Sequence, residues 1–368
     1  MKNPTERRAV VAPLLLYAVG YCLLAPVFAG CSSHEEIWAE GRPKHHTTEG
    51  FRNYPVVPEP RSAGFAFYVR RVWGSFFRPD VPADHFLPEK DAIAQYRQLG
   101  GRDSLTWLGH ATFLITLNGK RILTDPFLTE TASPFRMFGP RRFVPPGIGL
   151  ENLPAIDIIV VSHNHLDHLD EETVESLPGK ENIRVFVPLG LKSFFLERGY
   201  RNVTELDWYE SHTYENIRFM ALPTVHFSRR GLFDGNKTLW CSWSLSTATG
   251  KYYFGGDTAD SPSIFRETGQ RDGPYDLAMI PIGAYKIVKE EHSAHIAPEQ
   301  AVKIGREIGA DTMVAMHWGT IELSDEPHWE PPVRFTKAAR EAGMSDNQFW
   351  IMKIGETRPL PKHGNSSR

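Results

Sequence analysis

Short apolar segments rich in β-branched and aromatic residues recur along the chain, separated by polar stretches and helical patterns. The apolar segments predict strands, and Asn118-Gly119 predicts a hairpin turn between the first two. Apolar residues at helical spacing predict helices, and Pro298 followed by Glu299 marks one helix start. The predicted strands are Ser104–Leu117, Lys120–Thr124, Ile156–Val161, Arg218–Val225, Lys251–Phe254, Leu277–Ile280 and Met313–Met316, and the predicted helices are Asp170–Leu177, Gly190–Arg198 and Pro298–Ile308. This succession indicates an α/β fold.

The first thirty residues have a different pattern. A basic start is followed by an apolar run from Ala9 to Ala29, which is typical of an export signal. Val27–Cys31 resembles a bacterial lipobox, in which Cys31 would carry the lipid. The run approaches the ~20 residues that span a bilayer, so an uncleaved membrane anchor is the alternative for residues 1–30. Both interpretations place the protein at a membrane outside the cytoplasm, as an outer-membrane or periplasm-facing lipoprotein.

Residues 31–60 are polar and rich in Pro, Glu and His, which predicts a tether. We expect its histidines, His34, His45 and His46, to be solvated rather than to bind metal. Residues 61–360 are predicted to form the folded domain, and residues 361–368 a polar tail. Aromatic and basic residues mix over 65–77 and 135–143. Both stretches suit either a membrane interface or packing on the core.

Overall composition changes this picture only slightly. The 368 residues are 41% hydrophobic and 23% charged, as in ordinary globular proteins, and the formal net charge of -3 gives no indication of a nucleic-acid partner. Of the three cysteines, only Cys241 lies outside the N-terminal stretch, so no internal disulfide is expected. Cys241 lies in an apolar segment and is interpreted as a buried small residue. The fifteen histidines are the unusual feature.

Four potential metal ligands lie within the six residues His163-Asn164-His165-Leu166-Asp167-His168, directly after a predicted buried strand. Imidazole and carboxylate are zinc-type ligands, and a set without cysteine leaves room for catalytic water. One short loop cannot complete the coordination spheres of two metal ions, so residues at other strand ends must supply further ligands. His226, Asp257 and His317 each follow a predicted strand. The pattern predicts a two-metal hydrolase.

These motifs resemble those of the metallo-β-lactamase superfamily, an αββα sandwich with its metals at one edge of the two sheets. The resemblance implies that His163, His165 and His226 hold the first metal ion and that Asp167, His168 and His317 hold the second. Asp257 would bridge both ions. Asp125 corresponds to a structural aspartate near the site. The implied cofactors are two Zn²⁺ ions, with iron or manganese as alternatives.

Longer strings are similar to the N-acyl-phosphatidylethanolamine-hydrolysing phospholipases D, from about residue 60 to 358. The most specific are Pro281-Ile282-Gly283-Ala284-Tyr285 and His317-Trp318-Gly319-Thr320. This resemblance implies a membrane phospholipid substrate that is cleaved to phosphatidic acid and an N-acylethanolamine. The stretch Lys286–Ala294 departs from the family pattern, which leaves the exact lipid open.

The implied chemistry uses a water shared by two metal ions, which becomes hydroxide near neutral pH. Asp257 would orient this nucleophile and Asp167 would relay a proton. His295 matches a substrate-region histidine, with a head-group or acid/base role, and Tyr285 is a second substrate-binding candidate. His110 is expected to hydrogen-bond within the site region, whereas His292 is expected to be solvent-exposed.

Three alternative functions are compatible with the same metal-binding residues. A lactonase would have a mostly small, polar pocket, a nuclease would need strong basic charge, and a non-enzymatic lipoprotein would keep the metal site for binding or structure. The patterns His-x-Lys-x4-Asp and Gly-x-Ser-x-Gly are absent, which excludes the phosphohistidine route and a serine nucleophile elbow. A homodimer is compatible with the sequence.

Overall fold

Two seven-stranded sheets form the centre of the molecule, in a computed structural model that describes residues 41–57, 79–133, 139–231, 233–287 and 294–363. The first sheet has the order β14 (Thr357–Pro359), β1 (Ser104–Gly109), β2 (Thr112–Leu117), β3 (Lys120–Thr124), β4 (Ile158–Val160), β5 (Arg184–Pro188) and β6 (Asn202–Leu206). The second has the order β13 (Phe349–Trp350), β12 (Ala310–Met316), β11 (Tyr275–Pro281), β10 (Lys251–Phe254), β9 (Ser242–Ser246), β8 (Ile217–Leu222) and β7 (Ser211–Tyr214). Each half of the chain therefore builds one sheet, apart from β14, which returns to the first.

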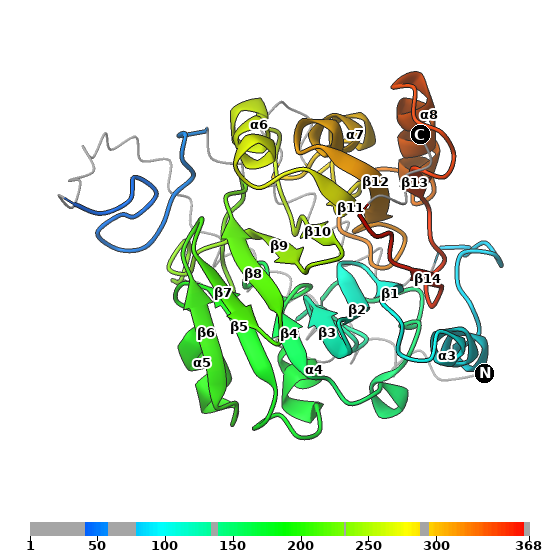
Figure 1. Cartoon of the computed structure of the whole chain (residues 1–368), viewed down its shortest axis with the longest axis horizontal. Helices are drawn as coiled ribbons and strands as arrows, with labels where there is room; N and C mark the ends of the chain where they lie inside the picture. The colour runs from blue at the N-terminus through cyan, green and yellow to red at the C-terminus, as the bar shows by residue number, and fades with distance from the viewer. Residues whose placement is uncertain (1–40, 58–78, 134–138, 232, 288–293, 364–368) are drawn as a thin grey trace, which may run out of the picture.

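Helices lie outside the two sheets, with α3 to α5 on the side of the first and α6 to α8 on the side of the second (Figure 1). They are α3 (Glu89–Gln98), α4 (Glu171–Ser176), α5 (Lys192–Glu197), α6 (Pro262–Arg271), α7 (Pro298–Glu307) and α8 (Glu330–Glu341), with a short 3₁₀ turn η1 (Leu150–Asn152). This arrangement is the αββα sandwich that the sequence predicts.

The core has separate layers because neighbouring strand residues face opposite sides of a sheet. Phe113 of β2 packs between the two sheets, where Phe186 of β5 stacks on Phe219 of β8 with ring centroids 4.3 Å apart. Leu114, the next residue along β2, packs instead in the outer layer with Val174 of α4. Aromatic side chains thus join the sheets, and aliphatic side chains join the first sheet to its helices.

Parallel strands direct several chain segments to the same edge of the sandwich. Strands β3 to β6 run parallel to one another, as do β10 to β13. The carboxyl ends of parallel strands meet at one sheet edge, where the following loops can approach one another. The polar residues after β3, β4, β10 and β12 are therefore placed together.

The predicted strand Ser104–Leu117 is wrong as a single element. The chain reverses between Gly109 and Thr112, so β1 and β2 pair antiparallel with an irregular register at this turn. His110 lies at the turn with a φ of 57°, a conformation that a strand does not allow. The three predicted helices are confirmed as α4, α5 and α7, each slightly shorter than predicted.

The expectation that His45 and His46 are solvated is also wrong. His45 Nε2 lies 2.6 Å from Asp207 Oδ1, and His46 Nε2 lies 2.7 Å from Asp207 Oδ2. The His45 ring stacks on Trp208 with centroids 4.2 Å apart and is buried. We call residues 41–57 the N-terminal strap, because this segment packs along the domain surface at the left of Figure 1.

Several expectations concern residues outside the described ranges: Cys31, the stretch 65–77, residues 135–138 and His292. In the second aromatic and basic stretch, the described residues Arg142 and Phe143 are buried, as packing on the core requires. Cys241 is buried too, as predicted. Across the described ranges, every helix is too short or too polar to cross a bilayer.

Candidate metal centre

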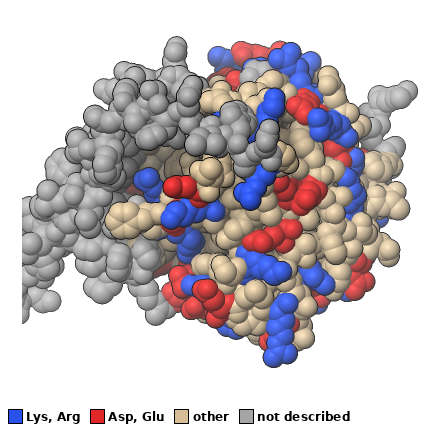
Figure 2. All heavy atoms as spheres, turned by 90° about the vertical axis from the view of Figure 1, so that its left-hand side faces the viewer, with Lys and Arg blue, Asp and Glu red and all other residues tan. Residues whose placement is uncertain are grey.

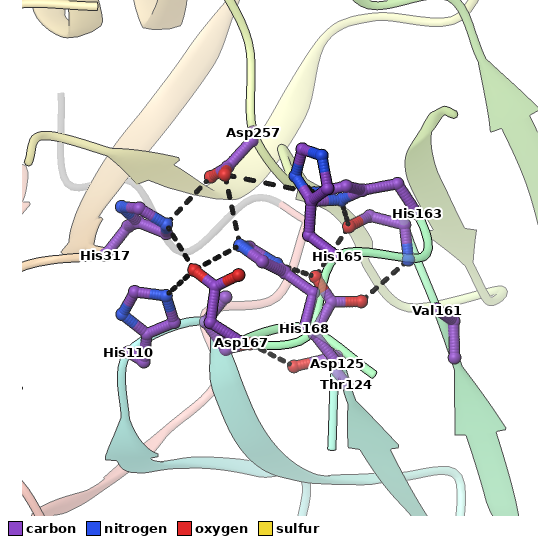
Figure 3. Close-up of polar contacts among 12 residues, drawn as sticks. His110, Thr124, Asp125, Val161, His163, His165, Asp167, His168, Asp257 and His317 are labelled. Carbon is purple, nitrogen blue, oxygen red and sulfur yellow. Dashed lines mark hydrogen bonds and ion pairs between the residues drawn. The ribbon is translucent and has the colours of Figure 1, made fainter. Parts of the chain in front are cut away.

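The structure brings together all seven predicted metal-ligating residues at the sheet edge (Figure 3). Asp257 and His317 come from loops after strands of the second sheet, as does His226, whereas the hexapeptide follows β4 of the first. Their ligand atoms form two groups with all atoms within 4.8 Å of one another. The first group is His163, His165, His226 and Asp257, and the second is Asp167, His168 and His317 together with His110, which was not among the seven predicted ligands.

Asp257 lies between these two groups. Its Oδ2 is 4.0 Å from His163 Nε2 and 3.8 Å from His226 Nε2 on one side, and 3.1 Å from His168 Nε2 on the other. Its Oδ1 is 3.2 Å from His317 Nε2. A carboxylate in this position suits a bridge between two cations, as the family resemblance implies.

Hydrogen bonds behind the site fix which nitrogen of each imidazole faces it. Asp125 accepts bonds from the Ser162 backbone N–H and hydroxyl, both at 2.6 Å. The same carboxylate accepts the His168 Nδ1–H at 2.6 Å, and the Ser162 hydroxyl oxygen accepts the His163 Nδ1–H at 2.9 Å. Nε2 of both histidines therefore carries a lone pair, as ligand histidines require. Asp125 has the structural role that was predicted for it.

Nitrogen atoms of the first group converge as the ligands of one cation would. His226 Nδ1–H donates to the Ala294 carbonyl at 3.2 Å, so its Nε2 also carries a lone pair. His165 Nδ1 lies 2.8 Å from His163 Nε2 and 3.2 Å from His226 Nε2. One Nδ1–H can satisfy only one of these two lone pairs, whereas a metal ion accepts electron density from all three.

The second group also contains buried nitrogen atoms that make no hydrogen bond to the described residues. Nε2 of His168 and of His317 is buried and makes no hydrogen bond to any described residue, although each lies within 3.2 Å of an Asp257 oxygen. Buried polar atoms without partners are rare and call for a ligand. The residues present therefore fit two bound metal ions.

The charge states favour ligation as well. Burial, reinforced by neighbouring histidines, holds the pKa of His163 and of His226 well below the usual histidine value, so both imidazoles are neutral. Burial alone would raise the pKa of Asp257, but His168 and His317 outweigh it and hold that pKa well below the usual range. Neutral His163 and His226 beside an ionised carboxylate are the forms that bind a divalent cation. In the second group, burial acts to lower the pKa of both histidines, but Asp257 and Asp167 outweigh it and raise the pKa of His168 well above the usual value and that of His317 to about 9, so a bound cation would displace a proton from each.

Some of these residues have a strained backbone. Asp125 and His317 have φ values of 33° and 61°, and non-glycine residues rarely adopt such values. Gly256, beside Asp257, has a φ of 57°, and a Cβ there would lie 2.5 Å from Ser162 Cβ. Each strained residue costs about 1–3 kcal/mol, which persists only where the surroundings enforce it, as at functional sites.

His110 joins the site more closely than the sequence indicated. Its Nε2–H donates to Asp167 Oδ2 at 2.9 Å, and its ring lies 3.9 Å from the His317 ring. The expectation that His110 hydrogen-bonds within the site region is confirmed, and Asp167 is its partner. His110 directly follows β1, but the predicted strand Ser104–Leu117 ran through it, so the search for residues at strand ends did not include it.

The two predicted substrate residues are placed differently. His295 Nδ1 lies 3.7 Å from Asp257 Oδ2, and its ring stacks on His317 at 5.2 Å, so His295 belongs to the site. The Tyr285 hydroxyl donates to Glu330 of α8 at 2.8 Å, and Arg334 lies over its ring. The substrate role of Tyr285 stays a prediction, with its hydroxyl already engaged.

Sequence reasoning missed Asn53 of the N-terminal strap. Its side-chain amide donates to the His226 carbonyl at 2.9 Å, and its side-chain oxygen accepts the His226 N–H at 3.1 Å. The same oxygen accepts the Trp240 indole N–H at 3.1 Å. Asn53 therefore clamps the backbone of a metal-ligating residue from 173 positions away, a relationship with no local signal in the sequence.

A small hollow of about 30 Å³ opens beside the second group, with His110 and His317 in its wall. Its lining combines apolar side chains with carboxylates: Phe143, Ala284, Trp318, Ile321, Leu323 and Pro331, with Glu322 and Glu326. Such a mixed wall accepts a molecule that has both apolar and polar parts.

Comparison with known proteins agrees with this geometry. The beta-lactamase superfamily domain matches residues 120–318. N-acyl-phosphatidylethanolamine-hydrolyzing phospholipase D 1 of Caenorhabditis elegans is 38% identical over 289 residues, which cover 75% of this chain and 78% of that protein. N-acyl-phosphatidylethanolamine-hydrolyzing phospholipase D, mitochondrial, of Saccharomyces cerevisiae is 35% identical. This match covers 68% of this chain and 55% of the yeast protein.

A solved structure with the same fold is a possible metal-dependent hydrolase from Veillonella parvula. It matches with a TM-score of 0.58 at 19% identity, and the match covers 70% of this chain and 100% of the Veillonella chain. The fold, the paired His/Asp groups and these relatives lead to one conclusion: the chain belongs to the β-lactamase superfamily and is a hydrolase of the metallo-β-lactamase fold.

Proposed function

We propose that the protein is a zinc-dependent phosphodiesterase of the phospholipase D type, which cleaves N-acyl-phosphatidylethanolamine-like lipids to phosphatidic acid and an N-acylethanolamine. The observation that carries the proposal is Asp257, placed between two complete sets of His and Asp side chains. The names of the nematode and yeast relatives supply the substrate class. The wall of the hollow contains apolar as well as polar side chains, whereas a lactonase is expected to have a mostly polar pocket.

The bound zinc ions would polarise the phosphoryl oxygens and activate the attacking water. The side chains of this chain would do the remaining work. Asp257 orients the water toward phosphorus, and Asp167, hydrogen-bonded to His110, is placed to take up a proton at Oδ2. A water O–P bond forms as the bond from phosphorus to the head-group oxygen breaks. His295 is the nearby side chain that we assign to the head group.

We also propose that the mature protein is held at a membrane outside the cytoplasm through Cys31 or through its N-terminal apolar run. The support is the basic start followed by residues Ala9–Ala29. A lipid substrate in the same leaflet would then be reached by search in two dimensions.

The test is hydrolysis by purified protein whose zinc, iron and manganese contents have been measured. N-acyl-phosphatidylethanolamine, ordinary phosphatidylethanolamine and a lactone are supplied separately in detergent. We expect phosphatidic acid from the N-acylated lipid and its loss in His168→Ala, with His212→Ala of the exposed strand β7 as the matched control. Hydrolysis of the lactone alone, or unchanged lipid hydrolysis in His168→Ala, would refute the proposal.

A further inference from the structure

Large apolar side chains are exposed at five described positions, and three of these lie in two adjoining segments. Tyr54 and Val56 belong to the N-terminal strap, and Phe233 belongs to a loop after His226. Phe233 is 86% exposed and Val56 is 69% exposed. The other two, Leu196 of α5 and Val333 of α8, are single exposed residues of an ordinary kind.

The loop that presents Phe233 is internally tied. The Asn236 N–H donates to the Ser228 carbonyl at 2.8 Å, and the Ser228 N–H donates to the Asn236 side-chain oxygen at 3.2 Å. Within the loop, the Asp234 carboxylate accepts the N–H groups of Arg230 and Gly231. A loop that uses its polar groups in this way holds Phe233 exposed, and none of the residues that the structure describes covers this apolar ring.

The strap and this loop form one continuous face. The Phe51 N–H donates to the Asn236 carbonyl at 2.8 Å, and Asn53 clamps His226 immediately before the loop. The Phe227 ring lies 4.6 Å from the His165 ring. The exposed aromatic face is therefore continuous with the metal-ligating residues.

This face is basic in an otherwise slightly acidic chain. Residues 41–57 and 226–237 hold six cations and two carboxylates, whereas the whole chain has a formal net charge of -3. Arg42, Lys44, Arg229 and Lys237 are exposed, while Asp234 is occupied within the loop. Figure 2 shows the side of the molecule that carries the strap, where Lys and Arg side chains lie among Asp and Glu side chains as well as uncharged surface, so the positive charge belongs to these two segments rather than to the whole side.

We propose that residues 41–57, 228–231 and 233–237 form a docking face for an anionic phospholipid bilayer, with Phe233 inserted at the level of the head groups. Aromatic side chains flanked by cations are the composition that favours a membrane interface. The inference rests on the proposed function, because it places the metal centre at the surface that holds the lipid substrate.

Photo-crosslinking tests the contact directly in the full-length protein. Phe233 is replaced by p-benzoylphenylalanine, a close analogue, and the protein is irradiated with vesicles of phosphatidylcholine and phosphatidylglycerol. Val333, 68% exposed on α8, is replaced in the same way as the control. Because the probe reports its own position, attachment through the N-terminus does not mask the result. We expect lipid adducts at position 233 and few at position 333.

Charge is tested with Arg229→Glu combined with Lys237→Glu, against Lys337→Glu on α8. The adduct yield at position 233 should fall by about fivefold for each cation removed, because a Lys or Arg near an anionic leaflet strengthens binding by about that factor. Vesicles of phosphatidylcholine alone should reduce the yield in the same direction.

Equal lipid adducts at positions 233 and 333 would overturn the docking face, as would crosslinks at 233 to a second copy of the chain in place of lipid. Crosslinking needs no hydrolysis, so the two proposals can fail separately. A protein that cleaves detergent-dispersed lipid without crosslinking keeps the proposed function and loses the docking face. A protein that crosslinks to lipid but cleaves none keeps the docking face and loses the proposed function.

Discussion

The ligand histidines depend on residues that would not themselves touch a metal ion. Asp125 accepts the His168 Nδ1–H and, through Ser162, sets the orientation of His163. In Asp125→Asn an amide N–H₂ would face these donors, and His168 could keep its bond only by moving its proton to Nε2. We expect metal affinity to fall by about 10- to 100-fold, as when such supporting partners are removed.

Competition with a chelator, read as bound zinc, measures that affinity directly. Asp157→Asn is the matched control, because Asp157 pairs with Arg121 at a partly exposed site away from the metal residues. Circular dichroism confirms that Asp125→Asn is folded. Unchanged zinc retention in folded Asp125→Asn would contradict the supporting role of this carboxylate.

Asn53 tests how far the metal centre extends into the N-terminal strap. Asn53→Ala removes the donor to the His226 carbonyl and the acceptor for the His226 N–H. We expect the free energy of unfolding to fall by about 1–3 kcal/mol, since buried groups lose their partners, and zinc to dissociate faster. Asn202→Ala, which removes an exposed amide bond to Glu181, should change neither. Lower stability with unchanged zinc dissociation would show that Asn53 stabilises the fold without positioning His226.

The sequence predicted the metal residues at strand ends well because parallel strands impose a common direction. A buried strand followed by His or Asp is a local pattern, and His163, Asp257 and His317 all showed it. The roles of His110 and Asn53 depend on a turn and on a contact across the fold. Neither has periodicity, so the pattern of the chain could not reveal them.

At the scale of elements, the best predictions were the strands that lead into a His or Asp and the helices with clear apolar spacing, whereas the buried strands β5 and β9 were missed. Strand β7 was missed because its residues are exposed or half-buried and pair only with β8. Strand β14 has three residues and depends on β1 for its pairing. Edge strands of this kind are determined by tertiary pairing rather than by their own sequence.

The strap is attached in part through the Asp207 carboxylate, which pairs with His45 and His46, so this part of the attachment should depend on pH. Burial acts to raise the pKa of Asp207, but the hydrogen bonds from His45 and His46 outweigh it and leave that pKa below the usual value. The unfolded chain therefore binds the proton more readily than the folded one. The stabilisation is fully present above the usual Asp pKa of about 3.9 and is lost as the pH falls through the lower, folded value.

Asp207→Asn removes this attachment while keeping the side-chain shape. Near neutral pH we expect the variant to be less stable than the parent by about 1–3 kcal/mol, the range for charge-assisted hydrogen bonds. Denaturant unfolding of both proteins across the acid range gives the difference, which should shrink toward zero in acid. A stability difference that is independent of pH would contradict an ionised Asp207 as the attachment point.

At the scale of the whole molecule, the metal centre joins the two sheets. The hexapeptide extends from the first sheet, and His226, Asp257 and His317 extend from the second. Without metal ions, the lone pairs and buried carboxylates of this edge face one another with no cation between them. Metal binding should therefore stabilise the entire sandwich rather than one loop.

Chelator-treated protein should unfold at a lower temperature than zinc-loaded protein. At free zinc about a thousandfold above its dissociation constant, binding to the folded state alone contributes about 4 kcal/mol. His168→Ala should respond less to zinc, while His212→Ala should behave like the parent. Calorimetry with and without chelator gives the comparison. If the two sheets are joined through the metal, the whole unfolding transition shifts to lower temperature in the chelator. Equal unfolding temperatures of the parent protein with and without chelator would show that the metal centre does not stabilise the fold.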